Sequence, residues 1–237
     1  MELTYLIENY SYLKFIVDVY EEYSKEHEIS DDIWFRKITR KYEEAKTFLS
    51  FIETAITMLP INKRSNYNNQ YEVVYRKSYI EKMKIKAISD LLNTSIRNAY
   101  SIRRHAMNMI EERVDLFFDY RFRIEKLDVP QNYPVAEVFD RCSEAETKDY
   151  YNLIVRMIQT ELGVIEGNLA YAMLIYSSRR LVSRYMRSNY PSLTQSAYRT
   201  YYKKVKNYIG VCLYGFDYLS SQKGYLVLEK EQKGASA

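Results

Sequence analysis

The scarcity of glycine and proline constrains the fold of this chain most, because 237 residues include only 6 Gly and 4 Pro. Average usage of roughly 7% and 5% would give about 28 in total. Sandwiches, barrels and dinucleotide-binding sheets need many glycine-rich turns, so the composition disfavours them. A hydrophobic content of 47% supports either one large helical domain or two small ones. We therefore expect an all-α, multi-helix protein with a central helix-turn-helix and a helical C-terminal domain.

Two long helices are predicted in the N-terminal region, residues 1–60. Apolar residues recur at helical spacing over residues 3–26 and again over residues 33–59, where Pro60 ends the pattern. These helices are expected to form an antiparallel hairpin. The acid-rich opening helix, Glu2 to Glu28, carries an apolar stripe with three candidate roles, namely the core of this chain, a seam in a homodimer, or a surface for a partner protein.

Polar and proline-containing stretches divide the rest of the chain. The Asn-rich stretch 61–70 and the sequence LDVPQNYP, with Pro130 and Pro134, predict linkers. Residues 61–127 are expected to form a helix-turn-helix region, and residues 128–220 a basic, Tyr-rich helical domain with helices over 136–162, 164–189 and 194–218. A frayed tail is expected over residues 221–237.

Several classes of site and location are disfavoured by the sequence. The two His and the two Cys lie without metal-ligand spacing, so we predict buried thiols at Cys142 and Cys212, no metal site and no cofactor. The carboxylates of Glu111, Glu112 and Asp115 are interpreted as a solvated patch. The N-terminal sequence MELTYLIENY has no basic leader, and charges interrupt every apolar run, which predicts no signal peptide, no membrane span and a cytoplasmic protein.

Residues 79–110 carry the pattern of a helix-turn-helix. A first helix closes at Ile80 and Met83, and a second can start at Lys84. The second helix has an apolar face formed by Ile88, Leu91 and Leu92. The turn follows at Asn93, a residue that tolerates positive φ, and Ser95 is a natural N-cap for the third helix. The third helix has a stripe expected to be buried, formed by Ala99, Ile102, Ala106 and Ile110.

The outward side of the third helix suits nucleic-acid contact, because Arg and Asn recognise base edges while Tyr and Ser reach phosphates. Residues 61–126 contain 14 Lys plus Arg and 8 Asp plus Glu, so the local charge of +6 exceeds the whole-chain +4. A solvated basic face is the alternative. We predict that the helix 95–110 enters the major groove of double-stranded DNA, with contacts from Ser95, Arg97, Asn98, Tyr100, Ser101, Arg103 and Arg104.

This segment, over about residues 71–115, resembles the region-4 helix-turn-helix of bacterial sigma factors. It has a Tyr-aliphatic-Glu helix end, an Ile-x-x-Leu-Leu scaffold helix, a turn, a Ser N-cap and a basic recognition helix. In layout it is most similar to the sigma-like phage late-gene transcriptional regulators of the ArpU/RinA type, although Asn93 replaces the usual turn glycine. The resemblance implies transcription regulation and RNA polymerase as a second partner.

A second basic region lies in the C-terminal half. Residues 167–216 contain no Asp or Glu, but eight Lys and Arg and nine Tyr. This composition fits a second nucleic-acid surface, and even a second helix-turn-helix with a scaffold at 181–186 and a cap at Ser192 or Thr194. The alternative is a helical hairpin whose tyrosines pack inward. The candidate contact residues are Arg179, Arg180, Arg184, Arg187, Arg199, Lys203 and Lys204.

The leading hypothesis is a sequence-specific DNA-binding regulator of transcription from a phage or other mobile element. The alternative is a helical interaction protein that captures a host or phage protein, such as RNA polymerase or a defence nuclease. An enzyme acting on nucleic acid is a weaker third hypothesis, because the sequence has no histidine pair, no Gly-rich phosphate loop and no cysteine cluster. We therefore predict no enzymatic activity.

Overall fold

A computed structural model describes residues 2–29, 33–61, 69–128, 133, 145–176 and 178–230. Helices dominate these residues, and the predicted all-α class is confirmed. The N-terminal helices are α1 (Glu2–Glu8), α2 (Tyr10–Glu26) and α3 (Ile33–Thr57). The middle of the chain forms α4 (Gln70–Tyr75), the π-helix η1 (Arg76–Ile80), α5 (Ile85–Leu91) and α6 (Ile96–Arg121). The C-terminal half forms α8 (Ala145–Leu162), α9 (Val164–Ile175), α10 (Arg179–Asn189) and α11 (Gln195–Ser221).

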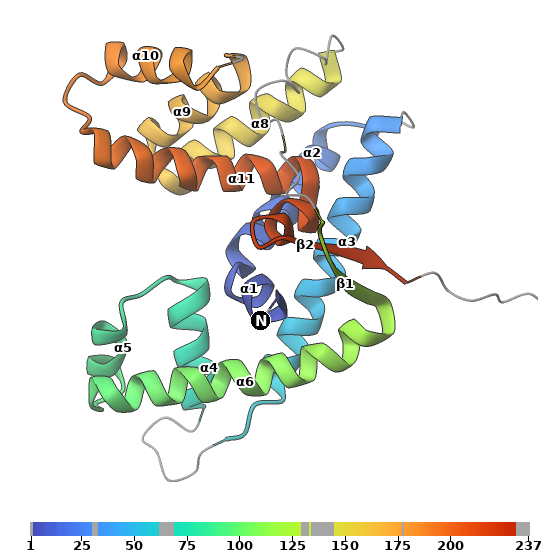
Figure 1. Cartoon of the computed structure of the whole chain (residues 1–237), viewed down its shortest axis with the longest axis vertical. Helices are drawn as coiled ribbons and strands as arrows, with labels where there is room; N and C mark the ends of the chain where they lie inside the picture. The colour runs from blue at the N-terminus through green and yellow to red at the C-terminus, as the bar shows by residue number, and fades with distance from the viewer. Residues whose placement is uncertain are drawn as a thin grey trace, which may run out of the picture.

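The N-terminal helices α1–α3 separate two helical groups, as Figure 1 shows. One group contains α4, α5 and α6, and the other contains α8 to α11. Both α6 and α11 pack against α3, and α11 also packs against α2. The ring of Phe48 on α3 lies 5.8 Å from Phe118 on α6 and 5.2 Å from Phe216 on α11. One hydrophobic cluster therefore joins all three parts of the chain.

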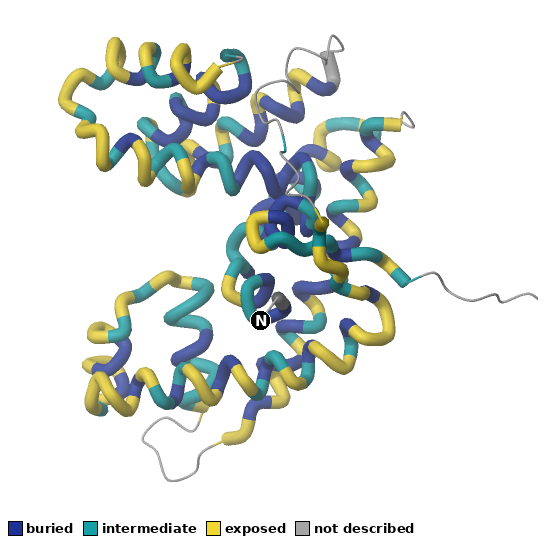
Figure 2. Tube along the Cα trace, in the orientation of Figure 1, coloured by how far each residue is buried: buried dark blue, intermediate teal, exposed yellow. Residues whose placement is uncertain are grey.

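The apolar stripe of the opening helices belongs to this core. Leu6, Leu13, Ile16 and Tyr20 are buried along α1 and α2, and buried residues line the inner sides of these helices in Figure 2. Burial of these side chains removes apolar area from water, the main favourable term in folding. Of the three roles considered for this stripe, the structure assigns it to the core.

Two short strands correct the expectation of a C-terminal tail. β1 (Phe122–Lys126) pairs antiparallel with β2 (Tyr225–Glu229), in a register from Phe122 opposite Glu229 to Lys126 opposite Tyr225. The tail predicted over 221–237 is thus wrong for residues 225–229, because pairing with β1 satisfies their backbone groups. Residues 231–237 lie outside the described part of the chain.

Several helix boundaries also differ from the expected ones. The predicted helix over 3–26 is interrupted at Asn9, and the one over 164–189 is interrupted between α9 and α10. The helix predicted over 136–162 is described from residue 145 onward. Cys212 is a buried free thiol, as predicted, whereas Cys142 lies outside the described residues.

Candidate functional site

The helix-turn-helix region has a small hydrophobic cluster of its own. Val74 of α4, Ile88 and Leu92 of the α5 segment, and Ile102 of α6 are buried together, and Met83 packs against them. This hydrophobic cluster therefore packs α5 against the start of α6, as expected for a scaffold helix in a helix-turn-helix. One expected core residue is misplaced, because Leu91 is 40% exposed. With Ile88 and Leu92 inward at i and i+4, the i+3 side chain points outward.

The predicted turn and cap are confirmed. Asn93 has φ of 48°, and the N–H of Thr94 donates to the carbonyl of Ser89 at 3.0 Å. The Ser95 hydroxyl accepts from the N–H of Asn98 at 3.1 Å. The side chain of Asn98 also donates to the Thr94 hydroxyl at 2.7 Å. Part of the hydrogen-bonding capacity of Asn98 therefore supports the turn.

The stripe predicted for the third helix is buried at all four positions, Ala99, Ile102, Ala106 and Ile110. The opposite side of α6 presents the candidate contact residues. Four of them are exposed, namely Arg97, Asn98, Tyr100 and Arg104, and Ser95 at the cap is exposed as well. Ser101 and Arg103 are half-buried.

Arg103 differs from the other basic residues of α6 because it stacks on two rings. Its guanidinium lies 5.0 Å from the ring centre of Tyr100 and 5.9 Å from that of Tyr79 in η1. Burial raises the pKa of Tyr79, and the positive charge of Arg103 acts in the opposite direction. Such stacking fixes the direction of the guanidinium and connects α6 to η1.

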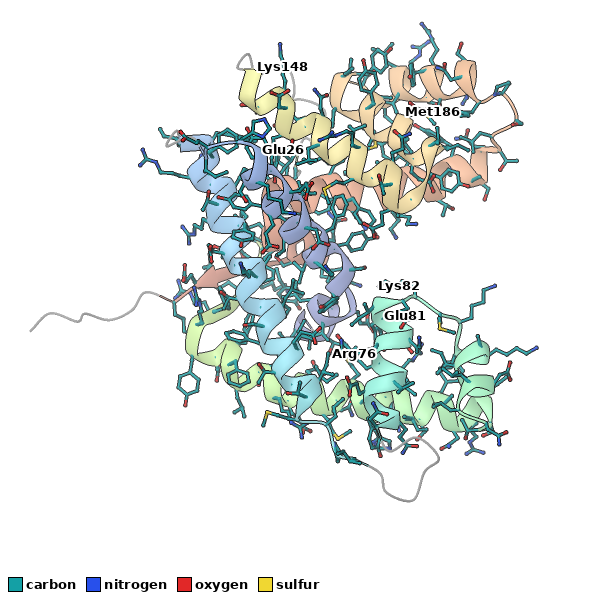
Figure 3. The ribbon with its side chains drawn as sticks, turned by 180° about the vertical axis from the view of Figure 1, so that it is seen from behind. Glu26, Arg76, Glu81, Lys82, Lys148 and Met186 are labelled. Atoms are coloured by element: carbon teal, nitrogen blue, oxygen red, sulfur yellow. The ribbon has the colours of Figure 1, made fainter. Side chains whose placement is uncertain are left out.

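An ion-pair network attaches this unit to the N-terminal helices through Arg76 of η1, which is labelled in Figure 3. Arg76 donates to Glu53 of α3 at 2.8 Å and to Glu72 at 2.9 Å. The Tyr10 hydroxyl donates to the same Glu53 at 2.7 Å, and the buried Tyr75 hydroxyl donates to the carbonyl of Ile7. These bonds hold the first helix of the unit at a defined place on α1–α3.

Sequence reasoning missed some exposed side chains near α6. Ile96, in its first turn, is 45% exposed beside Arg97, and Lys84 and Lys86 of the α5 segment are exposed as well. The sequence does contain a signal for the exposure of Ile96, because at helical spacing it falls outside the buried stripe that includes Ala99 and Ile102.

In the second basic region, α10 and α11 end and begin close to the predicted boundaries at residues 189 and 194. The Thr194 hydroxyl caps α11 by accepting from the N–H of Ala197 at 3.2 Å, so Thr194 rather than Ser192 is the cap. α10 turns Val182 and Met186 inward, and Leu181 is 39% exposed. The nine tyrosines differ in burial, and six of them are half-buried. Tyr198 and Tyr208 are buried, whereas Tyr171 is 43% exposed.

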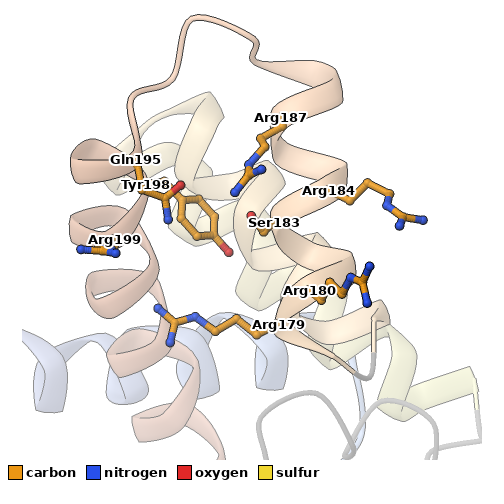
Figure 4. A pocket seen from close by; sticks show the side chains of 8 residues that line it. All are labelled: Arg179, Arg180, Ser183, Arg184, Arg187, Gln195, Tyr198 and Arg199. Atoms are coloured by element: carbon orange, nitrogen blue, oxygen red, sulfur yellow. The ribbon is translucent and has the colours of Figure 1, made fainter.

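The five predicted arginines of this region come together at one cleft between α10 and α11 (Figure 4). The cleft has a volume of about 670 Å³ and is lined by Ser183, Gln195 and Tyr198 together with Arg179, Arg180, Arg184, Arg187 and Arg199. We refer to it as the arginine cleft. Lys203 and Lys204 do not line it, but they line a second cavity of about 740 Å³, which shares Arg199 with the arginine cleft.

Comparisons with known proteins give no family. No family model matches the chain, and no curated protein or solved structure matches it.

Other site chemistries receive no support in the described residues. Within them, no three His, Cys, Asp or Glu side chains gather as metal ligands. Glu111, which was expected to lie in a solvated patch, accepts a hydrogen bond from the Thr4 hydroxyl. No described helix is long and apolar enough to cross a membrane.

Proposed function

We propose that this chain is a sequence-specific regulator of transcription that binds double-stranded DNA, encoded by a phage or another mobile element and acting in the cytoplasm. The observation that carries the proposal is the exposed, basic first half of α6, capped by Ser95 and held on a scaffold helix by the cluster of Val74, Ile88 and Ile102. A recognition helix presents its N-terminal residues to base edges in this manner.

The spacing of the exposed side chains suits the major groove. Arg97 and Arg104 are seven residues apart and lie on one face of α6, with a rise of about 10.5 Å between them. This distance corresponds to roughly three base pairs at 3.4 Å each. Tyr100 lies between them on the same face and is exposed. Arg side chains at these positions are suited to guanine edges, and Ile96 is suited to a thymine methyl group.

Selection of duplexes from a random-sequence library tests this proposal. The full chain should enrich one sequence, and fluorescence anisotropy should show tighter binding to that duplex than to a scrambled one. The double variant Arg97→Gln, Arg104→Gln should lose about 1–3 kcal/mol of discrimination for each lost base contact. If the chain forms a homodimer, the enriched sequence should be palindromic, with half-sites about one helical turn apart.

A matched control neutralises two charges outside the exposed first half of α6. Lys37 of α3 and Lys126 of β1 are both exposed, and the variant Lys37→Gln, Lys126→Gln has the same net charge as the test variant. It should keep the discrimination of the native chain. Failure of the native chain to enrich any sequence, or equal discrimination in the test and control variants, would contradict the proposal.

One observation favours the alternative of a protein partner such as RNA polymerase. In the second half of α6, Leu116 is 66% exposed and Tyr120 is 87% exposed, one helical turn apart. An apolar pair of this kind suits a partner protein. Capture of bacterial RNA polymerase that persists in Arg97→Gln, Arg104→Gln and is lost in Leu116→Lys, Tyr120→Lys would support this alternative.

A further inference from the structure

The charges of the arginine cleft and of the second cavity follow two helices. On α10, Arg180, Arg184 and Arg187 recur at i, i+4 and i+7. On α11, Arg199 of the cleft is followed one turn later by Lys203, which lines the second cavity. Four residues of helix advance about 6 Å, so each row is extended along its helix. In Figure 4, Arg179 and Arg187 reach toward α11 on either side of Tyr198, while the side chains of Arg180, Arg184 and Arg199 are directed outward, away from the space between the two helices. Two extended rows suit an extended polyanion better than a single compact anion.

The charge of the cleft is not compensated within the described ranges. There, none of the five guanidinium groups forms an ion pair with a carboxylate, and Arg179 instead lies 4.7 Å from the ring centre of Tyr202. Like charges at this density repel one another and favour the binding of an anion. Guanidinium groups bind phosphate oxygens in a bidentate manner.

The Tyr198 hydroxyl lies on the inner side of the cleft. Tyr198 is only 5% exposed, and burial raises the pKa of its hydroxyl, whereas the charge of Arg179 and hydrogen bonding to Ser183 and Arg179 oppose that rise. Figure 4 shows this hydroxyl directed toward Ser183 and the Arg179 side of the cleft.

The second cavity leads from the arginine cleft toward the helix-turn-helix unit. Arg199 lines both, and the second cavity also has Lys203 and Lys204 on one wall and Lys82, after η1, on another. Of its two carboxylates, one is neutralised by an ion pair and the other keeps its negative charge while accepting a hydrogen bond. Glu81 pairs with Lys77 at 2.7 Å, and Glu161 accepts from the Tyr208 hydroxyl at 2.8 Å.

The second cavity also lies next to a residue that contacts α6. Ile80 lines the second cavity, and the preceding residue, Tyr79, stacks with Arg103 of α6. Basic side chains therefore continue from α6, past the η1 end, to α11 and α10. In Figure 1 the start of α6 and the α10–α11 connection lie toward the same side of the molecule.

From this arrangement we infer that the arginine cleft binds backbone phosphates of the same DNA duplex whose bases α6 contacts. One chain then contacts one duplex at two places. The inference rests on the proposed function. It assigns the cleft a sequence-independent role, because phosphate contacts position a protein on DNA without reading its sequence. The bound DNA should consequently extend beyond the base pairs that α6 contacts.

Duplex length and salt dependence test the inference on the full chain. The probes are the enriched duplex trimmed to the selected base pairs and the same duplex extended by about ten base pairs on each side. The native chain should bind the extended duplex about tenfold more tightly at low salt. The variant Arg184→Gln, Arg187→Gln should lose that gain in affinity. The slope of log K against log salt should fall in magnitude by about 1.8, which is the value for two phosphate contacts. The variant should also lose hydroxyl-radical protection of the DNA on one flank.

The matched variants separate this inference from the proposed function. Arg97→Gln, Arg104→Gln should lose sequence discrimination but keep the gain from duplex length, and Lys37→Gln, Lys126→Gln should keep both. An unchanged slope and footprint in the cleft variant overturns the inference while leaving the proposed function intact. Binding of tripolyphosphate by the cleft, together with unaltered DNA binding in the cleft variant, overturns it in favour of a free oligophosphate ligand. If the native chain binds no duplex, both the inference and the proposed function are contradicted.

Discussion

The guanidinium of Arg76 lies 2.8 Å from the carboxylate of Glu53, and this ion pair joins the first helix of the helix-turn-helix to α3. Tyr10 donates to the same carboxylate at 2.7 Å. Burial disfavours the ionised form of Glu53, but the bonds from Arg76 and Tyr10 outweigh burial and lower its pKa. The orientation of α6 relative to α3 therefore depends on an ionised group that is distant from α6 in the sequence.

Acidification should weaken this attachment. A carboxylate whose pKa is lower in the folded than in the unfolded state stabilises the fold above its unfolded pKa, and the stabilisation is lost as pH falls through the folded value. We expect Glu53→Gln to cost about 1 kcal/mol at pH 7, since the pair is about one-third exposed, and to reduce the loss of stability below pH 4.5. Denaturant unfolding at several pH values measures both. Glu43→Gln, at an exposed position of α3, should change neither, and equal pH profiles for the native chain and Glu53→Gln would contradict the prediction.

Two buried tyrosines should respond oppositely to loss of their hydroxyl. The Tyr150 hydroxyl has no hydrogen-bond partner within the described residues, and burial raises its pKa well above the usual value. The Tyr208 hydroxyl donates to Glu161. Tyr150→Phe should stabilise the protein by up to about 1 kcal/mol, and Tyr208→Phe should destabilise it by about 1 kcal/mol. Thermal unfolding should show shifts of roughly 2–4 °C in opposite directions, and a lower Tm for Tyr150→Phe would show that its hydroxyl is satisfied.

Gly210 should not tolerate a methyl group. A Cβ at this position would lie 2.5 Å from the Tyr218 ring, closer than any packed contact. Helix propensity favours Ala over Gly by about 1 kcal/mol, yet we expect Gly210→Ala to destabilise the protein by about 1–3 kcal/mol because a packed ring must move. Gly224→Ala is a comparison that tests backbone strain without a steric clash, because Gly224 has φ of 78° and open space around it. Its expected cost is about 1 kcal/mol, and stabilisation by Gly210→Ala would refute the close approach.

The turn of the helix-turn-helix should accept glycine but not a β-branched residue. Asn93 has φ of 48°, a conformation that glycine adopts freely. Asn93→Gly should change the free energy of unfolding by less than about 0.5 kcal/mol, whereas Asn93→Val should cost about 1–2 kcal/mol. Asn108→Val serves as the control, because Asn108 is exposed within α6. Similar stability of Asn93→Val and the control would argue against the positive-φ turn.

Short-range patterns in the sequence predicted the central unit well. The Ser95 cap, the Asn93 turn and the buried stripe from Ala99 to Ile110 depend on neighbours within a few turns of helix, so their spacing contains the necessary information. Leu91 was assigned wrongly because an i+3 position at the end of a seven-residue helix can face either way until its partners are known.

Features that depend on distant partners could not be obtained in this way. The strand of residues 225–229 is fixed by β1, more than 90 residues earlier in the chain, and Glu53 meets Arg76 only after α3 and η1 have packed. The sequence by itself determined that the C-terminal half is basic and that α6 carries arginines. Tertiary structure decided that α10 and α11 place five arginines around one cleft and that Arg199 extends it toward η1. The physical reason is that helical periodicity sets which side of a helix a residue occupies, whereas the packing of distant apolar faces sets which sides meet.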